Sequence, residues 1–208
     1  MRSPPDAAFR LWTTPLYALF DSLGSSAPPR PADCIFVFAG RPERKRYGIE
    51  LWNLGFAPRL VLSVGRFEWR SVPELGLPDG GLASLAPTIP PGKRHFFLVL
   101  DSEGARARAV EVGGPGTWAE ARALADTMSR ERHRSVLVVS SFIHLRRATM
   151  VVRRRMRAPG IAVEETAVPE AAATIRRQGW WSRRMERDAV LLEAVKLALY
   201  WLRLRLPW

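Results

Sequence analysis

The chain has 208 residues, of which 47 % are hydrophobic, and this composition excludes a generally disordered protein. A single cysteine, Cys34, excludes an intrachain disulfide, and no Cys/His cluster has zinc spacing, so no metal is predicted. The formal net charge is +12; three of the 32 basic residues are lysines and the other 29 are arginines. Arginine favours an anionic partner such as a phosphate ligand, but an Ala- and Pro-rich composition typical of GC-rich genomes explains the arginines equally well.

The N-terminal segment shows no secretory signal, because its first 20 residues carry Asp6, Arg10 and Pro15 and have no clean apolar core. No run reaches the roughly 18 apolar residues of a membrane-spanning helix. We therefore expect a cytoplasmic protein, or one peripheral to a membrane. Residues 1–32 are expected to form a lead-in with a short helix near 9–23, and residues 33–208 a single domain of unknown oligomeric state.

Strands and helices alternate through the predicted domain. The strands are predicted at 33–38, 59–64, 95–100, 107–112, 135–140 and 161–165, and the helices at 43–54, 117–132, 143–156 and 180–206. This alternation implies a mostly parallel sheet covered on both faces. The third and fourth strands flank a polar turn at 101–104 and are expected to pair as a hairpin. Residues 66–94 hold little periodicity and form a long connection of the kind that is often functional or mobile.

Glycines and polar residues follow several of these strands. In open α/β sheets, ligands bind beyond the carboxyl ends of the strands, and helix N-termini there favour anions. Gly40 and Arg44 follow the first strand, and Ser63 and Gly65 end the second. Glu111 ends the fourth strand, and the 113–116 glycine loop after it leads into a helix with a capping-box spacing. The sequence therefore predicts an anionic-ligand pocket at this edge of the sheet.

Three segments resemble the YdcF/SanA/ElyC-like family, which is built on a domain of unknown function. The segments are 33–40 with Arg44 and Ser63-Val64-Gly65, then Glu111 with Thr117 and Glu120-Ala121, and finally Ser140-Ser141-Phe142-Ile143-His144-Leu145-Arg146-Arg147-Ala148. The last is the most specific. One departure is that only Gly40 remains where the family often has two or three glycines. The resemblance implies a Rossmann-like three-layer α/β/α sandwich, a role in cell-envelope biogenesis and S-adenosylmethionine as a possible cofactor.

Position and resemblance together select the candidate site. The candidate catalytic residues are Glu111, His144 and Arg147, and the candidate ligand-binding residues are Gly40, Arg44, Ser63, Gly65, Thr117, Glu120, Ser140 and Ser141. His144 is either a general acid/base or a structural histidine. Arg147 is either an oxyanion clamp or the partner of Glu111 in a buried salt bridge. Ser63 and Ser141 are expected to be hydrogen-bond donors or caps, because no nucleophile elbow is present.

Three classes of function remain open. The first is an enzyme, a hydrolase or transferase acting on a phosphate-bearing ligand. The second is a non-catalytic binding module for an adenosine-containing cofactor such as S-adenosylmethionine. Nucleic-acid binding is disfavoured, because the basic residues are scattered and no reading element is present.

The 180–206 helix is apolar almost all round. It is expected either to pack on the sheet or to contact an acidic membrane surface. The basic run 153–155 has the same two interpretations, a solvated helix face or a membrane contact.

Overall fold

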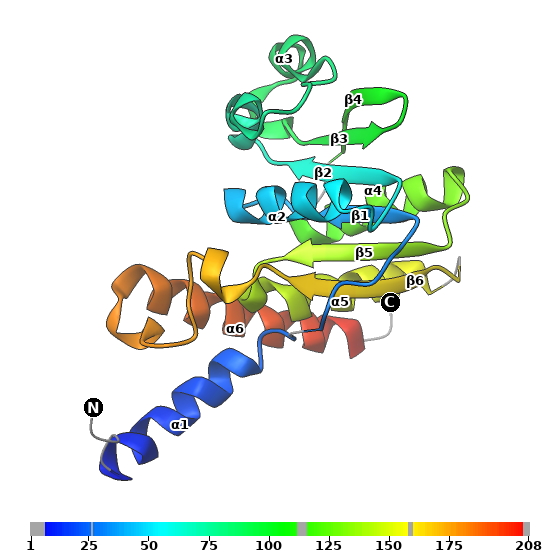
Figure 1. The fold of residues 1–208 in the computed structure, drawn as a ribbon. Coiled ribbons are helices and arrows are strands. Elements are labelled where there is room, and N and C mark those ends of the chain that lie inside the picture. The colour runs from blue at the N-terminus through cyan, green and yellow to red at the C-terminus, as the bar shows by residue number, and fades with distance from the viewer. Residues whose placement is uncertain (1–6, 26, 112–115, 158–159, 206–208) are drawn as a thin grey trace.

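The computed structural model describes residues 7–25, 27–111, 116–157 and 160–205, with side chains from residue 13 onward. Its centre is a six-stranded sheet in the order β4-β3-β2-β1-β5-β6 (Figure 1). The strands are β1 (Cys34–Val37), β2 (Arg59–Val64), β3 (Phe96–Asp101), β4 (Gly104–Ala109), β5 (Ser135–Ser140) and β6 (Ala162–Ala167). The pairs β2-β1, β1-β5 and β5-β6 are parallel, whereas β3 is antiparallel to β2 and to β4. The predicted hairpin and the mostly parallel sheet are confirmed.

The helices cover both faces of this sheet. They are α1 (Ala7–Asp21), α2 (Pro42–Asn53), α3 (Leu82–Leu85), α4 (Gly116–Arg130), α5 (Phe142–Met156) and α6 (Arg184–Arg205). Most predicted bounds are correct to within one or two residues. β4 begins three residues earlier than predicted, because Gly104 pairs directly with Asp101 across a tight turn.

Neighbouring residues of each buried strand supply two separate cores, because successive side chains point to opposite faces. Phe36 of β1 is fully buried against Leu124 of α4 and Val151 of α5. Val37, the next residue, is fully buried on the other face with Leu51 of α2. The structure is therefore a three-layer α/β/α sandwich, as predicted.

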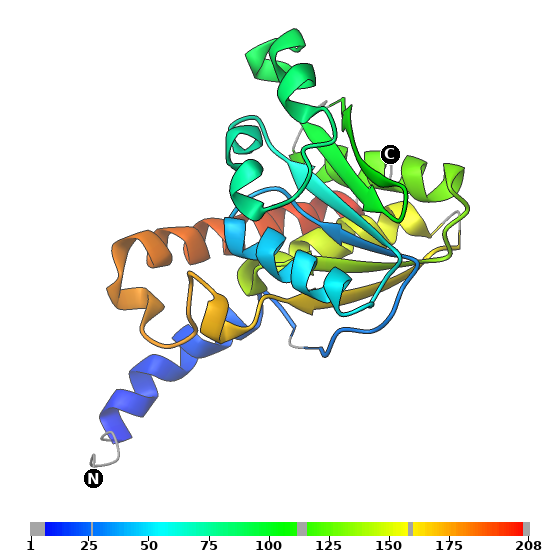
Figure 2. The same cartoon turned by 45° about the horizontal axis from the view of Figure 1, so that its top comes forward.

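The predicted lead-in takes part in the domain. Phe20 and Leu23, at and just after the end of α1, are buried in a third cluster with Ile143, Trp180 and Val190. The N-terminal part of α1 projects away from the sheet in both views (Figures 1 and 2). The C-terminal end of α1 therefore packs against α5 and α6, while the rest of α1 extends beyond the body.

The long connection after β2 consists of α3 and short 3₁₀ turns. The turns lie at Glu68–Ser71, Pro73–Leu75, Ala86–Thr88 and Pro91–Lys93. Val72, Leu82 and Ala86 are buried in the core beneath α2. The segment also covers the outer strand, because the N–H of Ala107 in β4 donates to the carbonyl of Gly80 at 2.8 Å. Its apolar residues are spaced irregularly, which is why the sequence showed no periodicity there.

The predicted C-terminal helix is interrupted near its start. Trp180–Ser182 form a 3₁₀ turn, Arg183 is extended, and α6 follows. α6 packs on α5, and Tyr200 stacks on Trp118 of α4 with ring centroids 5.9 Å apart. It therefore lies on the helical layer. Within the described residues, no helix combines the length and the apolarity that crossing a bilayer requires.

Candidate functional site

The sheet topology has its switch point between β1 and β5, and we call the region at the carboxyl ends of these two strands the crevice. The chain leaves β1 through α2 to reach β2 on one side, and β5 lies on the other side of β1. Such a reversal of direction opens a ligand crevice at the carboxyl ends of the two strands. Gly40 and Arg44 follow β1 there, and Ser140, Ser141 and His144 end or follow β5. The arrowheads of β2, β5 and β6 point to the left in Figure 1, and we call this side of the sheet its carboxyl edge.

Arg44 joins the two sides of the crevice. Its Nη1 donates to the carbonyl of Ala39 at 2.7 Å, and its Nη2 donates to the Ser141 hydroxyl at 2.8 Å. Its Nε is buried without a hydrogen-bond partner among the described residues. Gly40 has φ +129°, and a Cβ there would lie 2.8 Å from Arg44 Nη1. Glycine is therefore required at this turn both for the backbone and for the arginine to fold over it.

The turn after β1 already holds a carboxylate from the chain itself. The N–H of Gly40 donates to Glu68 Oε1 at 2.7 Å, and the buried Lys45 ammonium contacts Glu68 Oε2. Gly65 makes room for this carboxylate, because a Cβ at Gly65 would lie 2.9 Å from Glu68 Oε1. We call the Gly40 amide and the Lys45 ammonium the anion cradle. Glu68 and Lys45 were not predicted; the only signal was an acidic residue closely following the Ser63-Val64-Gly65 strand end.

A buried network of three polar side chains lies beside the cradle. Glu120 Oε1 accepts from the Ala39 N–H at 2.9 Å and from the Ser63 hydroxyl at 2.6 Å. His95 Nε2 lies 2.7 Å from Ser63 Oγ and donates to it, because the Ser63 proton points to Glu120. Burial raises the pKa of Glu120, against the lowering effect of its hydrogen bonds. Burial also lowers the pKa of His95 to about 4, so the imidazole is neutral at pH 7.

The order of the network shows what it can do. Serine, histidine and a carboxylate are the groups of a hydrolytic triad, but there the histidine stands between the other two. Here Ser63 stands in the middle, gives its proton to Glu120 and is fully buried. Ser63 and Glu120 therefore brace the ends of β1 and β2. His95 was not predicted, because nothing in its apolar strand marks it as a site residue.

His144 lies at the start of α5 and faces the same crevice region as Arg44. Its Nδ1 lies 2.7 Å from the Ser140 hydroxyl, and its ring packs edge-on against Phe38. The pKa of His144 is held well below its ordinary value, chiefly by burial and further by the charges of Arg44, Arg147 and Lys196. The imidazole is therefore neutral at pH 7, and Nε2 is the ring nitrogen left for a ligand.

Arg147 ties three helices together. Its Nη1 donates to the Thr117 hydroxyl of α4 at 2.9 Å, its Nε contacts the Glu193 carboxylate of α6, and its guanidinium lies over the Tyr200 ring. The buried salt bridge considered from the sequence therefore exists, but with Glu193 as the partner in place of Glu111. The structure does not show Arg147 as a clamp open to a ligand, because its charge is already paired.

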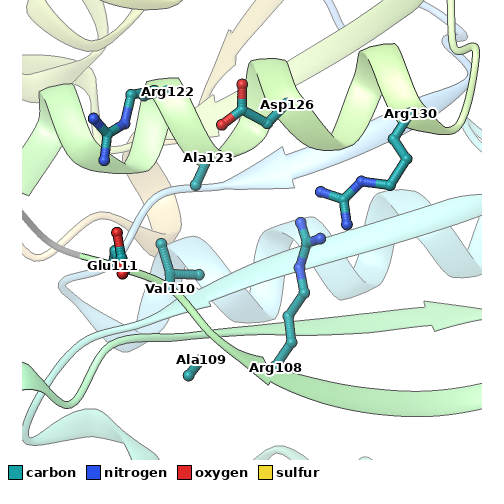
Figure 3. Close-up of a pocket in the computed structure, with 8 residues that line it drawn as sticks. All are labelled: Arg108, Ala109, Val110, Glu111, Arg122, Ala123, Asp126 and Arg130. Atoms are coloured by element: carbon teal, nitrogen blue, oxygen red, sulfur yellow. The ribbon is translucent and has the colours of Figure 1, made fainter.

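Glu111 does not join His144 and Arg147. It is exposed and lines a separate hollow of about 270 Å³ between the end of β4 and α4 (Figure 3). Across that hollow, Arg108 and Arg130 point toward each other. β4 is the outer strand, four positions from β5, and at about 4.8 Å per strand this separates them by roughly 19 Å. The expected convergence of these three residues is therefore wrong.

A second hollow of about 430 Å³ lies farther along the carboxyl edge, at the end of β6. Phe20, Phe142, Val168 and Ile175 give it an apolar lining. Phe142 directly follows Ser141, whose hydroxyl accepts from Arg44. The crevice therefore adjoins a space within the size range of small-molecule sites.

Comparisons with protein-family models, with curated proteins and with solved structures find no match. The resemblance to the YdcF/SanA/ElyC-like family therefore stays a prediction. Among the described residues, no group of three or more His, Cys, Asp or Glu side chains could hold a metal ion. Of the predicted 113–116 glycine loop, residues 113–115 lie outside the described residues, so its expected contact with a ligand stays a prediction as well.

Proposed function

We propose that this protein binds a small phosphorylated or otherwise anionic ligand at the carboxyl end of β1, in the anion cradle and the adjoining crevice. The observation that supports this is the carboxylate of Glu68 in the anion cradle, held by the Gly40 amide and the Lys45 ammonium. A backbone N–H and a buried cation are the donors that proteins use for phosphate and carboxylate oxygens. Glu68 therefore occupies the position that a ligand oxygen would take.

The ligand enters by exchanging with Glu68. The Lys45 side chain is only 5 % exposed, whereas the Glu68 side chain is 27 % exposed and lies on a 3₁₀ turn of the long connection. Removing Glu68 alone would leave a buried cation unpaired, which is costly. Replacing it with another anion keeps Lys45 paired, so the exchange costs little beyond moving the turn.

Arg44 and the start of α5 extend the site toward β5. Arg44 carries a buried Nε without a hydrogen-bond partner among the described residues, and Ser141 precedes the first turn of α5. Arg44 is also one of the cations that lower the pKa of His144, so its guanidinium lies near the start of α5. An anion bridging the cradle and Arg44 would be bound from both sides of the crevice.

The geometry supports binding more directly than turnover. His144 is neutral, but burial and the nearby cations that lower its pKa also disfavour its protonation, so it is a weak general base. Glu111 lies elsewhere, and the Ser140 hydroxyl beside His144 is fully buried, as is Ser63, so no exposed nucleophile stands beside His144 among the described residues. An S-adenosylmethionine module and a role near the cell envelope rest on the family resemblance alone, and S-adenosylmethionine enters as one arm of the experiment.

The test is to titrate the protein with inorganic phosphate, nucleotides and S-adenosylmethionine and to measure binding by calorimetry and thermal shift. Glu68→Ala empties the cradle, so phosphate affinity should rise by at least tenfold over the wild type. Lys45→Met removes the cation, so phosphate binding should be lost. Assaying each binding ligand for product distinguishes an enzyme from a binding module.

Glu74→Ala is the matched control, because Glu74 is an exposed glutamate on the same connection. It should bind phosphate as the wild type does. Circular dichroism of each variant checks the fold. The proposal fails if folded Glu68→Ala and Glu74→Ala bind every anion alike, or if folded Lys45→Met retains wild-type affinity.

A further inference from the structure

α6 carries a continuous apolar stripe that nothing in the described chain covers. The stripe consists of Leu191, Leu192, Val195, Leu199 and Leu202, whose exposed fractions lie between 46 % and 59 %. At about 100° per residue these five positions fall within an arc of roughly 100° on one side of the helix. We call them the α6 stripe. Exposed apolar patches of this kind mark interaction surfaces in soluble domains.

Basic side chains accompany the stripe on α6 and its neighbours. Arg203 of α6 and Arg155 of α5 each lie over the ring of Trp118, at 5.4 and 5.3 Å from its centroid. Arg205 lies 3.7 Å from the centroid of Trp201, which is itself about half exposed. At about 100° per residue, Arg203 and Arg205 border the stripe on its two sides, whereas Trp201 lies on the side of Val190. A stripe of leucines bordered by arginines is the composition of a membrane-interface helix.

The acidic residues of α6 are already paired with arginines. Glu186 pairs with Arg183, and Glu193 pairs with Arg147 in the interior. Asp188, at the N-terminal end of the stripe, lies within 4 Å of a nitrogen of Arg184. The charge that α6 offers to an incoming partner is therefore positive.

The positive charge of α6 distinguishes between the possible partners of the α6 stripe. A parallel copy stacked on the stripe would bring the two basic last turns, with Arg203 and Arg205, against each other, and like charges repel. An antiparallel copy would bring each last turn against a first turn whose Glu186 is already paired with Arg183. An anionic bilayer satisfies both parts of the surface, since its acyl region takes the leucines and its phosphates take the arginines. We propose that α6 lies flat on an anionic lipid surface and docks this protein there.

The dimensions of α6 suit a helix that lies in the interface. Its 22 residues are about 33 Å long at 1.5 Å per residue, and the stripe runs from Leu191 to Leu202. The opposite side is held to the domain by Val190 and Glu193, so the helix cannot turn to span a bilayer without leaving the domain. The proposed docking of α6 on a membrane does not depend on the anion cradle, so either proposal can fail without the other.

The test is cosedimentation of the full chain with vesicles of phosphatidylcholine, either alone or mixed with phosphatidylglycerol. The wild type should bind the mixed vesicles and not the neutral ones, and salt should weaken the binding. Leu192→Ser with Leu199→Ser should weaken it by at least tenfold. Arg203→Gln with Arg205→Gln should weaken it by about thirtyfold, since each arginine near an anionic surface contributes about 1 kcal/mol.

The matched controls remove equal apolar or charged groups elsewhere. Leu54→Ser with Phe67→Ser changes two exposed apolar residues outside α6, and Lys93→Gln with Arg132→Gln removes two exposed cations. Both should bind vesicles as the wild type does. Failure of the wild type to bind mixed vesicles, equal losses in the control variants, or a dimer in light scattering that only the leucine variant dissociates would overturn the proposal.

Discussion

The ion pair between Arg147 and Glu193 determines how firmly α6 is held to the domain. The two side chains are only 7 % and 10 % exposed, so water compensates neither charge. Glu193→Gln keeps the shape of the side chain but leaves the guanidinium without a counter-ion. Breaking a buried pair in this way costs about 3–5 kcal/mol. The Thr117 hydroxyl and the Tyr200 ring still contact Arg147, so we expect the free energy of unfolding to fall by about 2–4 kcal/mol.

Urea unfolding followed by circular dichroism measures this loss. A double variant, Arg147→Met with Glu193→Met, removes both charges and should lie within about 1 kcal/mol of the wild type. The exposed pair Arg184–Asp188, whose side chains are 88 % and 62 % exposed, is the control, and Arg184→Gln should cost less than about 1 kcal/mol. A loss below about 1 kcal/mol in Glu193→Gln, or a double variant less stable than the single one, would refute the reasoning.

Three further predictions concern single buried residues. The pKa of His95 is about 4 in the folded state and 6.5 ordinarily, so unfolding takes up a proton at any pH between these values. The free energy of unfolding should therefore fall by about 3 kcal/mol as the pH drops from 6.5 to 4. In urea unfolding, His95→Gln should show a shallower dependence on pH. Gly48→Ala would place a Cβ 2.3 Å from Val37 Cγ2, so its melting curve should show a loss of about 1–3 kcal/mol; an unchanged curve would mean that α2 shifts freely. Burial raises the pKa of the Cys34 thiol to about 12, so a thiol reagent should label it only as fast as the protein unfolds.

The elements of the fold could be predicted because their patterns are local. The apolar run from Val136 to Val139 between two serines indicates a buried strand without any knowledge of its neighbours. The positions of Gly40 and Arg44 after one strand, and of His144 after another, also placed them correctly at the carboxyl edge. This prediction needs only the rule that parallel strands end at one edge of the sheet, and it requires no distances.

The partners of those residues could not be predicted, because they depend on which strands are neighbours. Glu111 follows a strand like the others, but β4 is the outermost one, so Glu111 faces α4 instead of the crevice. Glu68 lies in a segment without periodicity, yet its carboxylate fills the cradle. Glu193 became the partner of Arg147 because α6 crosses α5, and no sequence pattern shows where one helix crosses another.

The outer strand β4 has a consequence for the solubility of this protein. It alternates Ala with Arg at 105–109, and the chain near Gly80 takes one of its outward N–H groups. An edge strand of this kind can template the addition of a strand from another molecule, and arginine side chains oppose such growth. Arg106 and Arg108 therefore act as gatekeepers, and replacing both with valine should convert a dispersed protein into one that forms fibrils on concentration.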